Sequence, residues 1–214
     1  MLCYITDRRQ FQGDDTVRRR RLLEKIAEAA QADVDYVQLR EKDLSDRDLE
    51  ALAHDVVRIL LGEVQGRTGS GRRTRLLINS RIDVALAAAA DGVHLRAADV
   101  LPSDVHQVWT RLDANRARAI VAVSCHSLVD VEGAECQGAD FALYGPVFEK
   151  QGAQITGLER LRRACRRKIP VLALGGVTIA NAVACFAAGA AGIAAIRLFQ
   201  ENNITEVVRK LNQR

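Results

Sequence analysis

The sequence predicts one α/β domain, a (β/α)8 TIM barrel over residues 1–214. Short apolar runs alternate eight times with longer segments of helical periodicity, which is typical of parallel strands joined by helical crossovers. The 214 residues are 48% hydrophobic, enough to bury one large core. Polar residues and glycines follow the apolar runs, at the end of the strands where such barrels carry their functional groups.

The first half of the chain contains four of these strand-then-helix units. The expected strands are the runs LCYIT (2–6), YVQLR (36–40), LLIN (76–79) and GVHL (92–95). The helices expected after them cover 15–32, 45–61, 82–90 and 103–112. Ser45 fits an N-cap, because acidic residues follow it in the first turn. Residues 62–75 interrupt the pattern after a helix and before a strand, which predicts a flexible loop on the face opposite the active site.

The second half repeats the pattern four more times. Its expected strands are AIVAVS (119–124), FALYG (141–145), VLALGG (171–176) and GIAAIR (192–197). The expected helices cover 128–137, 158–168, 178–188 and 204–212. Thr178 is a second candidate N-cap, and Gly138 and Gly189 fit the glycines that end helices. Eight units in a chain of this length favour a closed barrel.

Composition argues against several classes of function. A net charge of +4, with five Phe, three Tyr and one Trp, is a weak basis for binding nucleic acid, so the basic runs 17–25 and 71–75 are expected to be solvated faces. The five cysteines are widely spaced and form no CxxC pair, which favours a reducing, cytoplasmic compartment. No apolar stretch is long enough for a membrane span, and the N-terminal run is too short for a signal peptide. We expect no nucleic-acid or membrane partner.

The ends of the predicted strands suit a phosphorylated ligand. Arg40 and Lys42 follow the second strand, and Gly175 and Gly176 follow the seventh. Backbone amides at glycine turns point toward anions, and barrels often hold a phosphate after strands seven and eight. We therefore expect the two glycines and the Ile196–Arg197 turn to bind a phosphate. The alternative is that the glycines only make a tight turn.

Five segments in order resemble the thiamine-phosphate synthase (thiamine-phosphate pyrophosphorylase) and TenI family. They are VQLREKDL, LLINSRIDVALAAAADGVHL, VSCHS, GADFALYGPVFEK and the stretch from PVLALGGV to AAGAAGIAAIRLF. The resemblance implies an eight-stranded barrel, usually a homodimer, with a phosphorylated thiazole bound after strands seven and eight. For the synthase branch it also implies a magnesium-bound pyrimidine diphosphate, whose diphosphate leaves as its carbon bonds to the thiazole nitrogen.

The resemblance assigns roles to individual residues. Gln38, Arg40, Lys42 and Asn79 match groups that contact the diphosphate, and a departing diphosphate needs cations and magnesium to stabilise its growing charge. Asp99 matches one of two magnesium-binding aspartates, and carboxylate oxygens suit Mg²⁺. Asp99 alternatively caps the turn that follows it. The candidates for catalytic groups are Lys42, Ser124, which matches a serine beside the pyrimidine, and His126 in the same turn.

Three positions depart from the synthase pattern. Ser80 stands where the synthases carry the second aspartate, and serine is a poor substitute as a metal ligand. The loop 149–156 reads EKQGAQIT, in which only Lys150 is placed to replace the lysine that covers the diphosphate. Arg197 replaces a serine and adds positive charge beside the thiazole phosphate.

These departures resemble the TenI branch, which the resemblance links to a metal-free tautomerisation of thiazole phosphate carboxylate. That reaction needs a general acid or base, for which His126 is the candidate; the alternative for His126 is a structural bond to the backbone. Lys42 and Asp99 instead follow the synthase pattern. The sequence thus leaves a synthase as the first expectation, and a tautomerase or a regulatory protein that binds the phosphate without turnover as alternatives.

Overall fold

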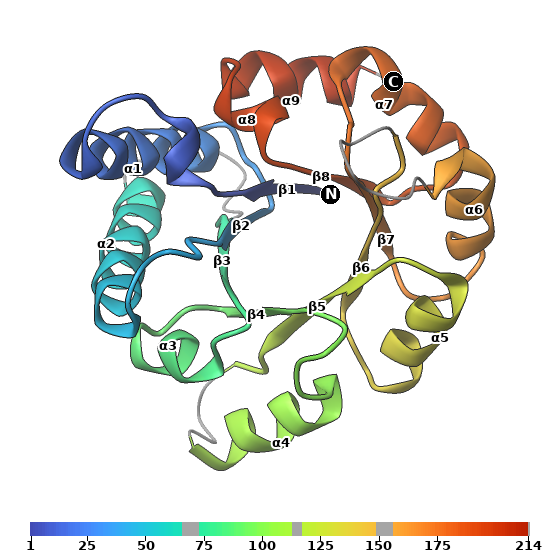
Figure 1. The fold of residues 1–214 in the computed structure, drawn as a ribbon, viewed down its shortest axis with the longest axis horizontal. Coiled ribbons are helices and arrows are strands. Elements are labelled where there is room, and N and C mark those ends of the chain that lie inside the picture. Colours follow the sequence, from blue (N-terminus) through green and yellow to red (C-terminus); the bar gives the residue numbers. More distant parts are fainter. Residues whose placement is uncertain (66–72, 113–116, 149–155, 214) are drawn as a thin grey trace.

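The fold is a closed parallel barrel of eight strands in chain order, surrounded by helices (Figure 1). The computed structural model describes residues 1–65, 73–112, 117–148 and 156–213. The first and last strands pair in parallel with Leu2 opposite Ile193, which closes the sheet. The predicted (β/α)8 barrel is confirmed.

No strand extends more than one residue beyond its predicted apolar run. The strands are β1 Leu2–Ile5, β2 Tyr36–Leu39, β3 Arg75–Asn79, β4 Gly92–Leu95, β5 Ile120–Cys125, β6 Phe141–Tyr144, β7 Val171–Leu174 and β8 Gly192–Ala195. All eight are parallel to both neighbours, so their C-terminal ends meet at one mouth.

The main helices follow the strands as predicted. They are α1 Asp15–Gln31, α2 Asp46–Gln65, α3 Ile82–Ala87, α4 Pro102–Leu112, α5 Leu128–Cys136, α6 Gly157–Ala164, α7 Ile179–Ala187 and α9 Ile204–Asn212. A 3-10 turn η1 (Arg8–Gln10) and a four-residue helix α8 (Arg197–Gln200) were not expected from the sequence. Both are shorter than the window over which helical periodicity can be recognised.

Three expected helix ends were wrong. Helix α3 ends at Ala87 rather than Ala90, and Ala89 has a φ of +57°, which a helix cannot contain. Helix α2 runs four residues beyond Leu61, because the exposed Gly62 costs only about 1 kcal/mol in a helix and does not by itself end it. The expected loop 62–75 is therefore helical at its start, and Arg75 already belongs to β3; residues 66–72 lie outside the described chain. Helix α6 ends at Ala164 rather than Lys168, where the backbone tightens into bonds between residues three apart.

The predicted helix caps are present. Ser45 Oγ accepts the Asp48 amide at 3.2 Å, and Thr178 forms a capping box with Asn181. Gly138 and Gly189 follow α5 and α7 with φ of +77° and +98°, a conformation that favours glycine.

Alternation along the strands divides the core into two layers. One set of side chains packs inside the barrel and contains Cys3, Ile5, Leu77, Ala122, Phe141, Leu143, Leu172 and Ala194. The alternate set, such as Val37, Ile78 and Val93, packs outward against the helices. Inward positions nearer the mouth carry polar residues instead, and these form the candidate site.

Candidate active site

Four polar side chains meet inside the mouth of the barrel. Gln38, Asn79, His94 and Ser124 stand at the last or next-to-last position of β2, β3, β4 and β5, and we call them the central cluster. Gln38 Nε2 lies 2.9 Å from Asn79 Oδ1 and 2.8 Å from His94 Nδ1. His94 Nε2 lies 3.0 Å from Ser124 Oγ. The sequence predicted three of the four.

His94 links the cluster as a neutral imidazole. Because Gln38 Nε2 is a donor, His94 Nδ1 accepts, and the assigned tautomer carries its proton on Nε2 and donates it to Ser124 Oγ. Burial lowers the pKa of His94 to about 4; nearby Asp99 opposes this effect, while Arg40 and Arg96 add to it. The Ser124 hydroxyl, which has no other hydrogen-bond partner among the described residues, is left with a hydrogen to donate.

The carbonyl oxygen of Gln38 is an acceptor without a donor. Gln38 is 1% exposed, and its Oε1 has no partner in the part of the chain that the structure describes. A buried acceptor left unpaired costs about 1–3 kcal/mol, so such groups call for an explanation. The central cluster therefore offers a ligand one acceptor, Gln38 Oε1, and one donor, the Ser124 hydroxyl.

A hydrogen-bond chain connects the central cluster to Asp99. Asn79 Nδ2 donates to Ser80 Oγ at 3.2 Å, and the Ser80 hydroxyl donates to the Asp99 carboxylate. Asp99 also accepts the Arg96 amide at 2.7 Å, so its carboxylate closes the turn that precedes it rather than the following turn considered above. Burial raises the pKa of Asp99, but the hydrogen bonds from Ser80 and Arg96 hold it below its ordinary value. Asp99 is therefore a charged carboxylate at neutral pH.

The donor set at Asp99 fits magnesium only with help from a substrate. Mg²⁺ is usually held by one or two carboxylates together with water and substrate phosphates. Asp99 supplies one carboxylate and Ser80 a neutral hydroxyl. Among the described residues, no three His, Cys, Asp or Glu side chains converge as a metal site. Phosphate oxygens would have to complete the ligand set.

Cations border the central cluster on the β2 side. Burial lowers the pKa of the half-buried Arg40, with Asp7 and Glu41 opposing this effect. No carboxylate in the described ranges lies within ion-pair distance of the Arg40 guanidinium. The side chain is thus placed to bind an anion from outside the chain. Lys42 is exposed two residues further on.

Glycines and a cation form an arc of the mouth after β7 and β8, which β1 separates from β2. Gly175 and Gly176 have φ of +92° and +65°, and a Cβ on Gly175 would lie 2.5 Å from the Pro146 Cβ. Packing and backbone conformation alone therefore require glycine at position 175. The amides of Gly176 and Arg197 donate no hydrogen bond to any residue that the structure describes. Arg197 is exposed at the start of α8 beside Ile196, so this arc offers free amides and one charge.

His126 is not part of the central cluster. Its Nδ1 contacts the Gly145 carbonyl oxygen at 2.5 Å, the backbone bond considered as an alternative above. With Tyr144, Arg160 and Arg163 it lines a hollow of about 190 Å³ toward α6. Tyr144 belongs to the outward-facing set of β6, so this hollow lies outside the barrel interior. The role of His126 as a general acid or base stays a prediction.

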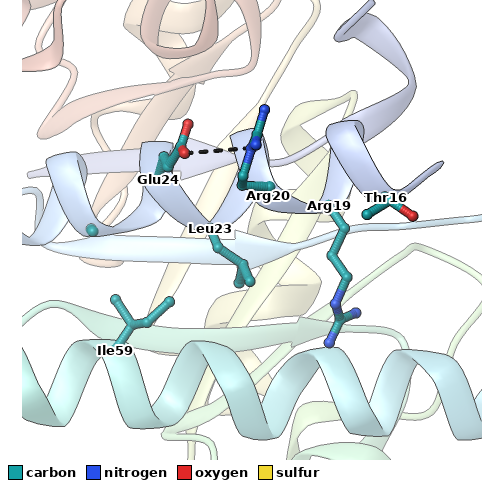
Figure 2. A pocket seen from close by; sticks show the side chains of 7 residues that line it. Thr16, Arg19, Arg20, Leu23, Glu24 and Ile59 are labelled. Carbon is teal, nitrogen blue, oxygen red and sulfur yellow. Dashed lines mark ion pairs between the residues drawn. The ribbon is translucent and has the colours of Figure 1, made fainter. Parts of the chain in front are cut away.

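Two features do not contribute to this site. A hollow of about 460 Å³ lies between α1 and α2, lined by Leu23, Ile59 and charged residues of α1, and it includes no candidate site residue (Figure 2). Lys150 and most of the loop 149–156 lie outside the described residues; Thr156 is buried just before α6.

No helix in the described chain is long and apolar enough to cross a membrane.

His94 is the residue that sequence reasoning missed. Within the run GVHL it reads as one more strand residue, and the family resemblance, although its second segment includes His94, assigned it no role. The signal that could have found it is the alternation of side chains along β4, which points His94 into the barrel as it does Gln38 and Ser124 on their strands.

The comparisons with known proteins agree with one another. Residues 2–199 match the sequence pattern of a family described as thiamine monophosphate synthase. Thiamine-phosphate synthase of Syntrophomonas wolfei is 34% identical over 218 residues, covering 99% of this chain and 94% of its own length. A relative from Aquifex aeolicus is 39% identical over 201 residues, covering 92% of this chain and 96% of its own.

A solved structure extends the likeness to the fold. Thiamine phosphate pyrophosphorylase from Pyrococcus furiosus superimposes with a TM-score of 0.77 at 28% identity, covering 99% of this chain and 93% of that one. The family match spans nearly the whole barrel, including the central cluster and the β7–β8 arc. The chain belongs to the thiamine monophosphate synthase family.

Proposed function

We propose that this protein joins hydroxymethylpyrimidine diphosphate to thiazole phosphate, forming thiamine phosphate and diphosphate. The observation that carries the proposal is the central cluster, whose Gln38 acceptor is unpaired within the described residues and whose Ser124 hydroxyl can donate. Arg40 follows β2 and Asp99 follows β4 at the same mouth. An aminopyrimidine has a complementary pattern, an amine that donates and ring nitrogens that accept. His94 holds Ser124 in position for this contact.

The departing diphosphate faces the cationic side of the mouth. As the pyrimidine methylene carbon bonds to the thiazole nitrogen, its bond to the diphosphate oxygen breaks and that oxygen takes the electron pair. Arg40 and Lys42 stabilise the growing negative charge, and Asn79 holds a diphosphate oxygen. Preorganised cations aimed at developing charge are the largest contribution most enzymes make to such a step.

Magnesium is assigned to Asp99, with Ser80 as a second oxygen. When bound, the ion would neutralise charge on the diphosphate. The chain from Asn79 through Ser80 keeps the Asp99 carboxylate oriented and ionised.

The thiazole phosphate is assigned to the β7–β8 arc. The amides of Gly176 and Arg197, which have no partner in the part of the chain that the structure describes, and the exposed Arg197 guanidinium support this assignment. Only β1 separates β8 from β2, the strand that Arg40 follows, so we place the two substrates next to each other at one mouth (Figure 1).

The test supplies purified protein with the pyrimidine diphosphate, thiazole phosphate and Mg²⁺, and detects thiamine phosphate. We expect product with Mg²⁺ and none with excess chelator. Conversion of the thiazole carboxylate tautomer without metal would instead identify a tautomerase, and calorimetric binding of thiazole phosphate without either turnover would identify a binding protein. A homodimer is proposed from the family resemblance, and sedimentation equilibrium tests it.

A further inference from the structure

A carboxylate is buried between the two cations assigned to the diphosphate. Glu41 lies between Arg40 and Lys42, and its side chain is 0% exposed. Acidic side chains are almost never fully buried unless they are paired. The structure therefore has to show what Glu41 is paired with, and why the chain carries a charge there.

Each oxygen of Glu41 has its own donor on the segment that follows β1. Thr6 Oγ1 donates to Oε1 at 2.6 Å, and the Arg8 amide donates to Oε2 at 2.9 Å. The Arg8 guanidinium adds an ion pair at 3.7 Å. We call Thr6, Arg8 and Glu41 the β1 clamp.

Thr6 holds the neighbouring residue as well. While its hydroxyl donates to Glu41, its Oγ1 accepts the Arg40 amide at 3.0 Å. One buried hydroxyl thus fixes the backbone of Arg40 and the side chain of Glu41 at the same time. The backbone of Arg40 is therefore fixed, and its guanidinium extends from a fixed position.

Arg8 fixes the other end of the segment. Its Nη1 lies 2.8 Å from both carboxylate oxygens of Asp43, and its Nη2 lies 2.8 Å from Asp15. Lys42 therefore stands between two residues, Glu41 and Asp43, that are both bound to Arg8. Because Arg8 satisfies these carboxylates, they do not compete for Arg40.

Stability alone does not explain the β1 clamp. A buried ion pair recovers little more than its desolvation cost, and apolar residues of similar size often stabilise as well or better. What hydrogen-bonded charges do provide is one defined geometry. Catalysis depends on such geometry, since a displacement of about 1 Å can cost about 10²-fold in rate.

We propose that the β1 clamp is a positioning device: Thr6 and Glu41 hold the Arg40–Lys42 segment in its diphosphate-binding geometry. This inference rests on the proposed function, which assigns these cations to the diphosphate. Thr6 and Glu41 act through Arg40 and Lys42 and touch no substrate themselves.

The test compares Thr6→Val, which keeps the side-chain shape but removes both hydrogen bonds, with Thr6→Ser, which keeps the hydroxyl. The probe is inorganic diphosphate with Mg²⁺, titrated by calorimetry, followed by separate KM values for the two substrates. Thr6→Val is expected to raise the Kd for diphosphate about tenfold. The KM for the pyrimidine diphosphate should rise with it, the KM for thiazole phosphate should not, and Thr6→Ser should restore both values.

The matched control is Asp15→Asn, which changes the exposed outer partner of Arg8 and should leave both KM values within twofold of wild type. If Thr6→Val does not fold, Glu41→Gln replaces it, because its amide nitrogen places a donor against the Thr6 hydroxyl or the Arg8 amide. If the wild type is active and the folded variant binds diphosphate with an unchanged Kd, the clamp proposal is wrong and the proposed function stands. The same conclusion follows if both KM values rise equally. A wild type that neither binds diphosphate nor forms thiamine phosphate overturns the function itself.

Discussion

Replacing His94 by glutamine should remove a pH dependence of stability that the wild-type protein carries. The pKa of His94 falls from 6.5 to about 4 on folding, chiefly through burial. Between these pH values the unfolded chain takes up a proton on this imidazole and the folded chain does not. The free energy of unfolding must therefore decrease as the pH falls through this window, and the contribution is complete above about pH 6.5.

The magnitude follows from the same two values. At about 1.36 kcal/mol per pH unit, the fall in pKa corresponds to ~3 kcal/mol lost between about pH 6.5 and pH 4. Urea unfolding, followed by circular dichroism from about pH 4 to pH 8, measures this for wild type and His94→Gln. Subtracting the two curves cancels the other titrating groups. We expect the wild type to lose ~3 kcal/mol more than the variant over this window, and parallel curves would refute the buried neutral imidazole.

Three further predictions concern the ligands. Asp99→Asn should lower turnover with Mg²⁺ by about 10²-fold or more, because it removes the carboxylate assigned to the ion; an unchanged rate would remove Asp99 from the metal site. Ser80→Asp should lower the Mg²⁺ concentration for half-maximal rate about tenfold by adding a second charged ligand, whereas Ser80→Asn should not; equal behaviour of the two variants would contradict a site at Ser80. Arg197→Gln should raise the calorimetric Kd for thiazole phosphate about tenfold, ~1.4 kcal/mol, and leave the unphosphorylated alcohol unaffected; a similar loss for both ligands would exclude a phosphate contact.

The barrel could be predicted because its signals are local. Each strand is a short apolar run, each helix has its own periodicity, and caps such as Ser45 and Thr178 mark where helices begin. The mouth residues could be predicted because parallel strands bring their C-terminal ends together. The helix α8 was missed because four residues are too few to show a repeating pattern, and the end of α2 was missed because Gly62 looks like the start of a loop.

The arrangement within the mouth was harder to predict, because it depends on which way single side chains point. His94 and His126 look alike in sequence, each a lone histidine near a strand end. Strand parity carries His94 into the barrel, whereas His126 follows β5 and contacts the Gly145 backbone. The β1 clamp joins residues more than thirty positions apart, so no local pattern shows that Glu41 is buried.

The backbone at Ser80 bears on how the family's metal site can change. Its φ of +61° lies in the left-handed region, which aspartate and asparagine adopt several times more readily than most residues with a side chain. The Ser80 amide donates to the His94 carbonyl oxygen at 2.8 Å, a backbone bond to β4 that does not involve the side chain at position 80. An aspartate would enter the turn without rebuilding it. A metal site with one carboxylate and a metal site with two therefore differ by a single substitution at position 80, on the same backbone.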